Sequence, residues 1–395
     1  MSDERRDADR GDGAPRRPHP PHHDYRRDLP ESGLEIVLDP PDPDEPSTPS
    51  DEVNADQLSI GRRLRDPRTI VSIVVPLIVV VLVAFNLPEL QLDQLLPTIG
   101  AASPGLLLLA FVAHYSGFPI RGYRWHRLLK STGANIRVRD ATEILFISWL
   151  VNCVVPAKLG DVYRAYLLRL NYLVSLSRTF GTVFIERVFD LFAIALLGLA
   201  AGFWSFRTGL SPEVQFIFGL GVVIIAALGV GLFLLRNFGR RTLERLPLPG
   251  AVVEFYDRFE EGVFSIRRGD VWKLGVLTVA VWSTEAVRLI FVMLALGFSD
   301  LNLGISGAFF VALAASLLTA IPLTPAGLGV VEAGVITILT VIYRVPLTEA
   351  TAIALLDRAI SVLSVIGLGS IAYLLSSKTK AGPRLPVDVS GDAPA

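Results

Sequence analysis

The sequence predicts an all-α polytopic membrane protein, with about six transmembrane spans and two Pro-Gly hairpins arranged as an inverted internal repeat. Three observations predict this class. Of the 395 residues 51% are apolar and 19% are charged, which is a high apolar fraction for a soluble domain. Several uncharged runs are long enough to cross a bilayer. Two motifs also recur at nearly the same spacing. The single cysteine, Cys153, excludes an internal disulfide and any cage of cysteines around a metal.

Charge divides the chain into an acidic tail and a basic body. Residues 1–56 contain 16 of the 38 acidic and 7 of the 37 basic residues, so the remainder carries 30 basic and 22 acidic side chains. Ten of the 26 prolines fall in residues 1–50, and such a segment cannot bury enough apolar surface to offset the entropy of ordering it. We predict a disordered cytoplasmic tail at 1–60, a membrane domain at 61–376 and a second disordered cytoplasmic tail at 377–395.

The predicted spans follow one another through the body of the chain. Residues 69–86 form an uncharged run just long enough to cross a bilayer. Two shorter apolar runs, 141–156 and 303–323, stop at Pro-Gly breaks, and we predict them as the first and second hairpins. The other spans are expected at about 101–120, 179–205, 214–235, 273–298 and 349–375.

Lysine and arginine predict the orientation, because cytoplasmic loops carry an excess of them. Four arginines precede the first span, residues 87–100 contain no Lys or Arg and are expected as an outer loop, and six basic residues cluster at 121–139. The continued alternation predicts a multi-pass protein of the cell (inner) membrane with both termini in the cytoplasm. Residues 250–268 carry apolar side chains near helical spacing, which predicts an interfacial helix.

An internal repeat joins the two hairpins. Residues 156–162 read PAKLGDV and residues 325–331 read PAGLGVV, an offset of 169. Some thirty residues later each motif is followed by an acid–Arg pair, with an offset of 171: Glu186-Arg187 and Asp357-Arg358. Two matches at nearly one offset indicate an internal duplication.

The count of spans predicts how the two halves are related. Three predicted spans separate the hairpins, and three is odd, so the second hairpin should enter the membrane from the opposite side. The halves, about 101–236 and 271–376, are therefore expected to be inverted repeats. Transporters built on this plan hold their substrate near the bilayer midplane.

Charged side chains surround the tip of the first hairpin. Lys158 lies at the tip, and Asp161 and Arg164 are three residues apart on a short helix expected after Gly160. The free N–H groups and positive dipole at a helix start favour a phosphate, and Gly160 permits close approach of the backbone. The alternative is that the Pro-Gly break only turns the chain and that these charges face cytoplasmic water.

The second hairpin carries fewer charges. At an offset of 169, Lys158 corresponds to Gly327 and Asp161 corresponds to Val330, which leaves Glu332 as the charged residue there. The two halves are therefore expected to be unequal, with the basic site facing the cytoplasmic side.

Charged residues also lie within the predicted spans, where each needs a partner or water. Glu186 and Asp190 are four residues apart and share a helix face, with Arg187 between them. These residues either line a path for a lipid headgroup or form a structural ion-pair network. The repeated pair Asp357-Arg358 fits both interpretations.

A basic stripe precedes the first hairpin. Arg121, Arg124 and Arg127 are three residues apart and alternate with Tyr123 and Trp125. This pattern favours positive-inside anchoring at the membrane interface, with headgroup capture as the alternative.

The remaining candidates indicate packing more than catalysis. Glu285 and Arg288 are three residues apart and either neutralise each other or pair with Glu332 or Asp190. His114 is expected to pack between helices. We find no nucleophile arrangement, no Walker motif and no dinucleotide motif in the sequence. We therefore expect no catalytic residue, no metal, no cofactor and no ATP-driven pumping.

Four motifs occur in order along the body, and together they resemble the membrane domain of the lysylphosphatidylglycerol synthase/flippase family. They are residues 124–129 (RWHRLL), 152–165 (NCVVPAKLGDVYRA), 186–190 (ERVFD) and 322–333 (PLTPAGLGVVEA). The resemblance covers roughly 65–376 and implies a domain that moves lipids between leaflets. Asp161 stands where a Glu is common in the family, which keeps the charge and shortens its reach. We expect this flippase-like half alone, because no stretch outside the membrane is long enough for the family's soluble aminoacyl-transfer domain.

These observations favour an integral membrane lipid translocase that moves a phospholipid or a lipid-linked product. The alternatives are a membrane-embedded lipid-modifying or glycosyl-transferring enzyme, and a membrane scaffold for a separately encoded lipid synthase. The enzyme would need a metal-binding D-x-D motif or a catalytic loop in the body, and we find neither there, since the two D-x-D matches, at 7–9 and 42–44, lie in the tail. The expected partners are the lipid substrate, the bilayer and, for the scaffold, a separate lipid-modifying enzyme, with no nucleic acid.

Overall fold

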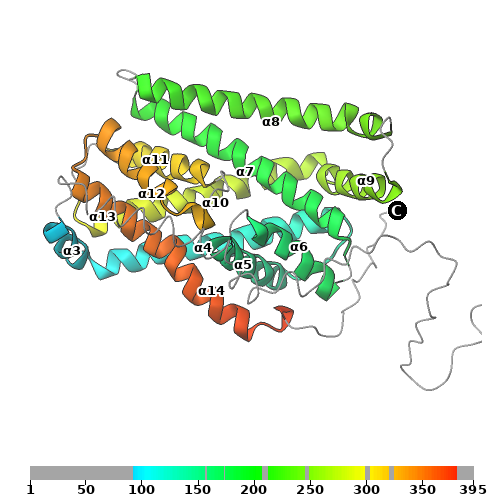
Figure 1. Ribbon diagram of the computed structural model, residues 1–395, viewed down its shortest axis with the longest axis horizontal. Coiled ribbons are helices and arrows are strands. Elements are labelled where there is room, and N and C mark those ends of the chain that lie inside the picture. The colour runs from blue at the N-terminus through cyan, green and yellow to red at the C-terminus, as the bar shows by residue number, and fades with distance from the viewer. Residues whose placement is uncertain are drawn as a thin grey trace, which may run out of the picture. The chain divides into compact units, whose positions relative to one another are not determined.

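The computed structural model describes seven stretches of the chain, all within one compact unit. They are residues 92–155, 158–172, 174–206, 212–244, 249–298, 303–319 and 324–379. Among these residues every regular element is a helix (Figure 1). The predicted N-terminal tail, the predicted span 69–86 and the C-terminal residues after 379 lie outside the described residues.

The first half of the bundle begins with two helices at a sharp angle. A bend of 79° separates the two, and Pro104 occupies the first turn of the second, where a missing N–H costs nothing. The first of these helices lies within the predicted outer loop 87–100, whose side of the membrane stays a prediction. The helices of this half are α3 (Leu92–Gly100), α4 (Pro104–Ser131), α5 (Val138–Val154), α6 (Leu159–Tyr172) and α7 (Leu176–Ser205).

Two helices connect the halves, and a second series follows them. The connecting helices are α8 (Pro212–Glu244) and α9 (Gly250–Phe264). The second series is α10 (Arg268–Ala295), α11 (Gly304–Leu318), a 3-10 turn (Pro325–Gly327), α12 (Val330–Thr337), a π-helical turn (Ile338–Ile342), α13 (Leu347–Arg358), a second π-helical turn (Ala359–Leu363) and α14 (Ser364–Leu375). A 3-10 turn at Ser377–Thr379 follows, so the predicted disordered tail begins at least three residues too early. Lys378 is held there, since its Nζ donates to Tyr172 Oη at 2.8 Å.

Several helices are long and apolar enough to cross a membrane. Four meet this condition singly, and a fifth is added when α3 and α4 count as one bent span. The four are Phe218–Arg240, Arg268–Ala295, Pro325–Ile342 and Leu347–Leu375. The third of these is the second limb of the second hairpin, which the sequence did not indicate as a span. The total of about six spans stays a prediction.

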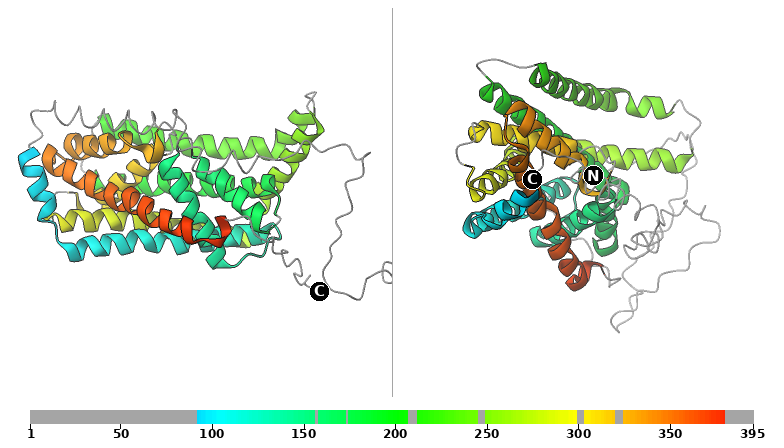
Figure 2. Two further views of the ribbon diagram at one scale, coloured as in Figure 1. Left: turned by 60° about the horizontal axis from the view of Figure 1, so that its bottom comes forward. Right: turned by 60° about the vertical axis from the view of Figure 1, so that its left-hand side comes forward.

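Helices α4 and α10 pack side by side in opposite directions (Figure 2). Arg127, near the end of α4, donates from Nη2 to Asp270 Oδ1 at the start of α10 at 2.5 Å. At the other end, Ser103 N–H donates to Ala295 O at 2.8 Å. Both helices are 28 residues long, and each is followed by a shorter helix and then by a Pro-Gly break. This antiparallel pairing is the arrangement that inverted halves require.

Each half packs one of its helices against a hairpin of the other half. Helix α7 of the first series packs against α11, and α14 of the second series packs against α5. Each hairpin therefore contacts a helix from the other half. Two apolar cores result, one centred on residues such as Leu128, Ile144 and Leu167, the other on residues such as Leu289 and Val311.

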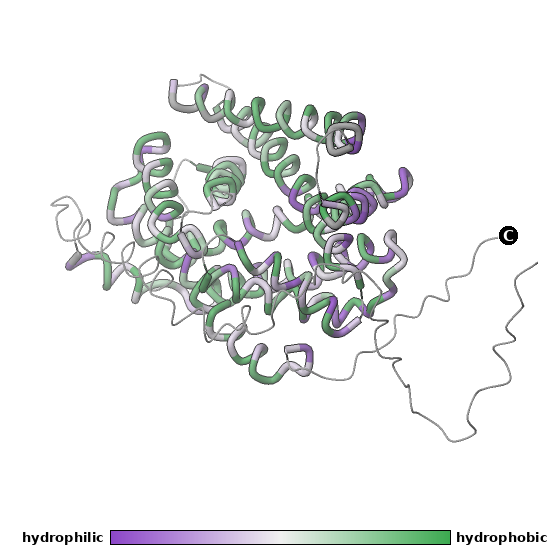
Figure 3. Tube along the Cα trace, turned by 45° about the vertical axis from the view of Figure 1, so that its right-hand side comes forward, coloured by the Kyte–Doolittle hydropathy of each residue, from purple (hydrophilic) through white to green (hydrophobic). Residues whose placement is uncertain are grey.

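The bundle combines buried charged side chains with an apolar outer surface. Figure 3 shows hydrophilic residues inside the helix bundle as well as at its ends. On α8, by contrast, large apolar side chains such as Phe216, Val223 and Phe233 are 74%, 62% and 61% exposed. An exposed apolar surface of this extent is suited to lipid contact.

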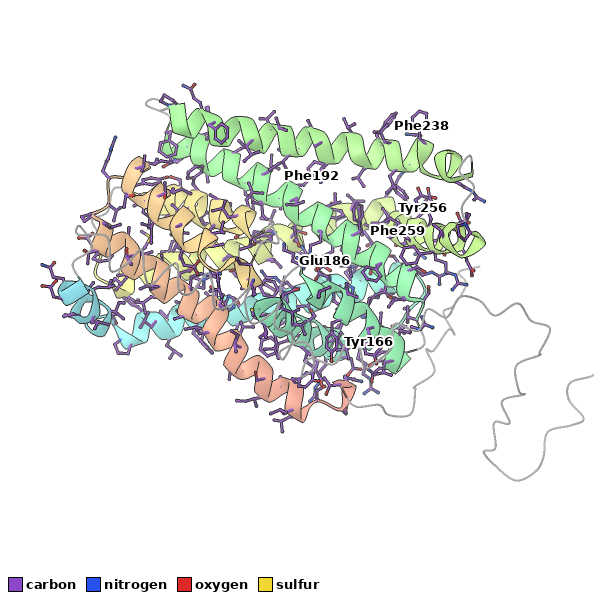
Figure 4. The ribbon with its side chains drawn as sticks, in the orientation of Figure 1. Tyr166, Glu186, Phe192, Phe238, Tyr256 and Phe259 are labelled. Carbon is purple, nitrogen blue, oxygen red and sulfur yellow. The ribbon has the colours of Figure 1, made fainter. Side chains whose placement is uncertain are left out.

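Helix α9 forms within the predicted interfacial segment 250–268 and packs closely on α7. A Cβ at Gly181 would lie 2.2 Å from Phe259 O, and a Cβ at Gly262 would lie 2.3 Å from Arg178 O. Only glycine permits these two backbones to approach so closely. Figure 4 shows Tyr256 and Phe259 on α9 beside α7, with Phe238 on α8. The location of α9 at a membrane interface stays a prediction.

Candidate functional site

Both halves of the bundle line one cavity of about 350 Å³. Its size lies in the range of pockets that hold small ligands or headgroups. Apolar residues such as Leu191, Ile194, Leu289 and Val311 form part of the wall. The charged side chains on the wall are Arg121, Lys158, Asp161, Arg187, Asp190, Glu285, Arg288, Asp357 and Arg358.

The first hairpin, α5 and α6, is tied to α7 by a two-point ion pair. Arg187 Nη2 donates to Asp161 Oδ1 at 2.7 Å, and Arg187 Nε donates to Asp161 Oδ2 at 3.0 Å. Such paired N–H···O bonds give a strong and directional contact. Lys158 also lines the cavity, and it has no hydrogen-bond or ion-pair partner among the described residues. Its φ is +52°, a left-handed conformation that non-glycine residues rarely adopt.

The second hairpin, α11 and α12, is tied to α13 in the same way. Arg358 Nε donates to Glu332 Oε1 at 2.8 Å, and Arg358 Nη2 donates to Ala326 O. The other oxygen of Glu332 accepts the N–H of Gly329 at 2.6 Å, at the start of α12. In both hairpins the carboxylate precedes its arginine by 26 residues.

Helix starts set the register between the hairpins. Helix α6 begins at Leu159 and α12 begins at Val330, and the residue before each has a positive φ, +52° at Lys158 and +83° at Gly329. Counted from these helix starts the offset is 171, which equals the offset of the acid–Arg pairs and exceeds by two the 169 of the matching Pro-Gly letters. Asp161 corresponds to Glu332 and Lys158 corresponds to Gly329. The two halves therefore differ in charge at the lysine position, where the second half has glycine, and both carry a carboxylate at the other position.

Gly160 serves helix packing. A Cβ at this position would lie 2.0 Å from Ser148 O on α5. The N–H of Gly160 donates to Asn152 Oδ1 at 2.8 Å, so it is not free for a phosphate. The predicted close approach of the backbone is therefore to α5 and not to a ligand.

Arg164 lies in the protein interior and does not line the cavity. It is 2% exposed, its Nη1 donates to Glu186 Oε2 at 2.9 Å, and its guanidinium carbon lies 4.8 Å from the centroid of the Trp125 ring. The expected phosphate site at the hairpin tip is thus corrected. Lys158 and Asp161 line the cavity, and Arg164 belongs to a buried network behind them.

That network is centred on Arg124, which is 1% exposed. Arg124 Nη2 donates to Glu186 Oε1 at 2.8 Å, and Arg124 Nη1 donates to Asp190 Oδ1 at 2.6 Å. Glu186 and Asp190 share a helix face, as predicted, and Figure 4 shows Glu186 on α7 within the bundle. The arrangement of Glu186 fits the structural interpretation, whereas Arg187 and Asp190 also reach the cavity wall.

The interpretation of the basic stripe as an interfacial anchor is wrong for two of its three members. Arg121 is 3% exposed, and its Nη2 donates to Glu285 Oε1 at 2.7 Å. Arg124 is buried as described above. Arg127 alone of the three is partly exposed, and it pairs with Asp270.

Glu285 and Arg288 form a pair, which was one of the predicted alternatives. Arg288 also binds Asp357, with Nε–Oδ1 at 2.8 Å and Nη2–Oδ2 at 3.0 Å. Among the described residues neither pairs with Glu332 or Asp190, since those two carboxylates bind Arg358 and Arg124 instead. A continuous chain of charges thus runs from Arg121 through Glu285 and Arg288 to Asp357.

Two features of the cavity were missed by sequence reasoning. His114 lines the wall, although we predicted it as a packing residue. Trp149 and Trp282 flank Arg121, at 4.8 Å and 5.9 Å from the guanidinium carbon to the ring centroids. Both tryptophans are distant from Arg121 in the sequence, so no local sequence pattern predicts that they flank it. Within the described residues no group of three or more His, Cys, Asp or Glu side chains is arranged to hold a metal.

The fold and the cavity define a helical membrane protein with a charged chamber between two hairpins. The chain matches the family described as lysylphosphatidylglycerol synthase TM region over residues 70–369. It therefore belongs to that family, and both the predicted family and the predicted class, an all-α polytopic membrane protein, are confirmed.

Curated relatives include membrane proteins of archaea. The UPF0104 membrane protein MJ1078 of Methanocaldococcus jannaschii is 38% identical over 227 residues, which cover 57% of this chain and 93% of that protein. UPF0104 membrane protein MJ1595 of the same organism is 22% identical over 329 residues, or 78% of this chain and 94% of that protein. Glycosyltransferase AglD of Haloferax volcanii is 30% identical over 348 residues, which cover 79% of this chain but 56% of that protein.

Proposed function

We propose that the protein moves a phospholipid or a lipid-linked product between the leaflets of the cell membrane, with the headgroup passing through the cavity. The observation that carries this proposal is the charged chamber between two matched hairpins that belong to antiparallel halves. Charged side chains inside a membrane domain are costly and usually mark a substrate path. The apolar, outward-facing α8 is suited to remain in lipid while a headgroup occupies the chamber.

The charge of the wall favours an anionic or zwitterionic headgroup. Its charged side chains are five cations and four carboxylates. The carboxylates each bind an arginine, and Lys158 is the cation without such a partner among the described residues. A phosphate entering the chamber would find one full positive charge that is not already neutralised.

The two hairpins supply a mechanism for access. In inverted halves the hairpins enter from opposite sides, so the pair Asp161–Arg187 would close one end of the chamber and the pair Glu332–Arg358 the other. Opening one end requires its ion pair to separate while the other remains closed. The basic tip at Lys158 then belongs to the cytoplasmic end, with both termini in the cytoplasm.

Leaflet exchange in reconstituted vesicles tests the proposal. The protein should speed the exchange of a labelled phospholipid relative to empty vesicles, without added ATP. Lys158→Ala should slow the exchange about tenfold or more, because a hydrogen bond to a charged group contributes roughly 1.5–3 kcal/mol. Lys130→Ala, which removes the same charge from the exposed end of α4, is the matched control and should leave the rate unchanged. Equal rates for wild type, Lys158→Ala and empty vesicles would refute the proposal.

The relative named as a glycosyltransferase supports a second candidate. This chain would then be the membrane part of a lipid-glycosylating system, acting on a lipid-linked sugar or holding a separately encoded enzyme. Mass spectrometry separates the candidates. An enzyme would change the mass of the reconstituted lipids when a nucleotide sugar is supplied, whereas a translocase would change only their leaflet. A scaffold would do neither and would copurify with its synthase.

A further inference from the structure

We propose that His114 and Arg121 of α4 form a binding site for the phosphate oxygens of the substrate inside the cavity. The inference rests on the proposed function, because it assigns the part of the substrate that the chamber holds. The ligand chemistry is a phosphate mono- or diester, whether it belongs to a lipid headgroup or to a free phosphate.

The two side chains share one face of α4. His114, Gly117 and Arg121 are spaced three and four residues apart, which places them on the same side of a helix. A Cβ at position 117 would lie 2.6 Å from Arg121 Nη1 and 2.9 Å from Thr284 Oγ1. Glycine therefore leaves the space that the guanidinium occupies. Both His114 and Arg121 line the cavity.

His114 presents an unused hydrogen-bond donor. Its Nδ1 lies 3.1 Å from Arg288 Nη1, and because an arginine N–H can only donate, Nδ1 must accept. The ring proton is therefore on Nε2. Glu285 Oε2 is 3.8 Å from Nδ1, which is beyond hydrogen-bond distance. The Nε2 atom is buried and has no partner among the described residues.

Arg121 presents a second unused donor. Its Nη2 is bound to Glu285 at 2.7 Å, while its Nη1 is buried without a partner among the described residues. Trp149 and Trp282 hold the guanidinium between them, so its orientation is set before any ligand arrives. Buried donors are rarely left unpaired, and two on one wall indicate a missing acceptor.

The missing acceptor is best supplied by a phosphate. Both free groups are N–H donors, which excludes a cation, and Lys158 adds a positive charge to the same wall. The nearby carboxylate of Glu285 is already bound by Arg121 and Arg288. A phosphate offers several oxygens and a negative charge, so it supplies acceptors for both donors.

Two substitutions at His114 test the donor, and Arg288 Nη1, which loses the Nδ1 acceptor in the methionine variant, keeps Glu285. His114→Gln keeps an N–H donor at the end of the side chain, whereas His114→Met keeps the size and removes the donor. Arg121→Lys is a third variant, which keeps the charge beside Glu285 and removes the planar second nitrogen. The full-length protein is kept in a phosphate-free maltoside detergent, and unfolding temperatures verify that each variant is folded.

Binding is measured by native mass spectrometry with phosphatidylglycerol, with diacylglycerol of the same chains, and with inorganic phosphate as competitor. We expect wild type to retain phosphatidylglycerol and not diacylglycerol. His114→Met and Arg121→Lys should weaken this binding about tenfold, and His114→Gln should stay within about threefold of wild type. Competition by millimolar inorganic phosphate would identify free phosphate as a ligand of the same site; its failure would identify the lipid headgroup.

Equal retention of the two lipids by wild type, or folded His114→Met that binds phosphatidylglycerol as wild type does, would overturn the inference. Leaflet exchange measured on the same preparations separates it from the proposed function. Phosphate-dependent binding without exchange would refute translocation and leave this site standing. Exchange that His114→Met and Arg121→Lys do not alter, together with unaltered binding, would refute the site and leave translocation standing.

Discussion

The first and second hairpins have the same arrangement of helices, but their carboxylates make different contacts. In the first, both oxygens of Asp161 bind Arg187 on the crossing helix α7. In the second, Glu332 divides its oxygens between Arg358 and the N–H of Gly329 in its own turn. The longer glutamate side chain can reach back to the helix start as a capping group. Both tips are therefore bound by an arginine of a neighbouring helix, and the second tip is held in addition by its own carboxylate.

The acidic residues directly before these arginines, Glu186 and Asp357, differ more strongly in their surroundings. Glu186 binds two arginines, Arg124 and Arg164, and all three side chains are at most 3% exposed. Asp357 occupies the equivalent position and binds Arg288 on the cavity wall. One acid therefore closes a buried network, while its counterpart faces the chamber. Equivalent charges in a repeat thus have a mainly structural role in one half and are available for binding in the other.

Neutralising Glu186 and Asp357 one at a time should give the largest difference in stability between the two halves. Glu186→Gln should lower the free energy of unfolding by about 3–5 kcal/mol, because it leaves buried arginines without their carboxylate. Arg164 would keep only Asp161, 3.8 Å away. Asp357→Asn should cost less, since Arg288 retains Glu285. Chemical unfolding in detergent measures both, and equal losses would contradict the division between a structural half and an open half.

Gly160 offers the next largest effect. Gly160→Ala should destabilise the protein by about 1–3 kcal/mol, because its Cβ would overlap a backbone oxygen of α5 that has little freedom to move. Gly105→Ala is the matched control, since no atom lies within 4 Å of that Cβ in the first turn of α4. The control should be neutral or slightly stabilising. If both variants unfold alike, the close packing of α5 on α6 is not what Gly160 provides.

The smallest effect on stability is expected at the hairpin tip. Lys158→Gly gives the first hairpin the residue type of the second, and it removes the strain of a left-handed lysine, which costs about 1–2 kcal/mol. Greater freedom of the unfolded chain offsets part of this gain, so the unfolding midpoint should change little. Leaflet exchange should nevertheless fall, since strain kept at a charged residue indicates function. A variant with unchanged exchange would remove Lys158 from the site.

Much of the fold was predictable from the sequence, and the pairing of charges was not. The acid–Arg pairs at 186–187 and 357–358 have the same offset, 171, as the starts of α6 and α12, whereas the matching letters of the Pro-Gly motifs are 169 residues apart. Arg121 and Arg124 have the pattern of interfacial anchors, because counting charges takes no account of acids on distant helices. Their partners Glu285 and Glu186 come from α10 and α7 and meet them only through tertiary packing. His114 carries no local signal, since its neighbours in space are likewise remote in sequence.

The central claim, that lipid headgroups pass through the chamber, is tested most directly by blocking it. Cys153 is the single cysteine of the chain and lies on the cavity wall, so a bulky methanethiosulfonate reagent places an obstruction there and nowhere else. Leaflet exchange should fall in proportion to the labelled fraction, recover when a reductant removes the label, and stay constant in Cys153→Ala. Protein that intact mass shows to be fully labelled, yet that exchanges lipid at the unlabelled rate, would contradict the account.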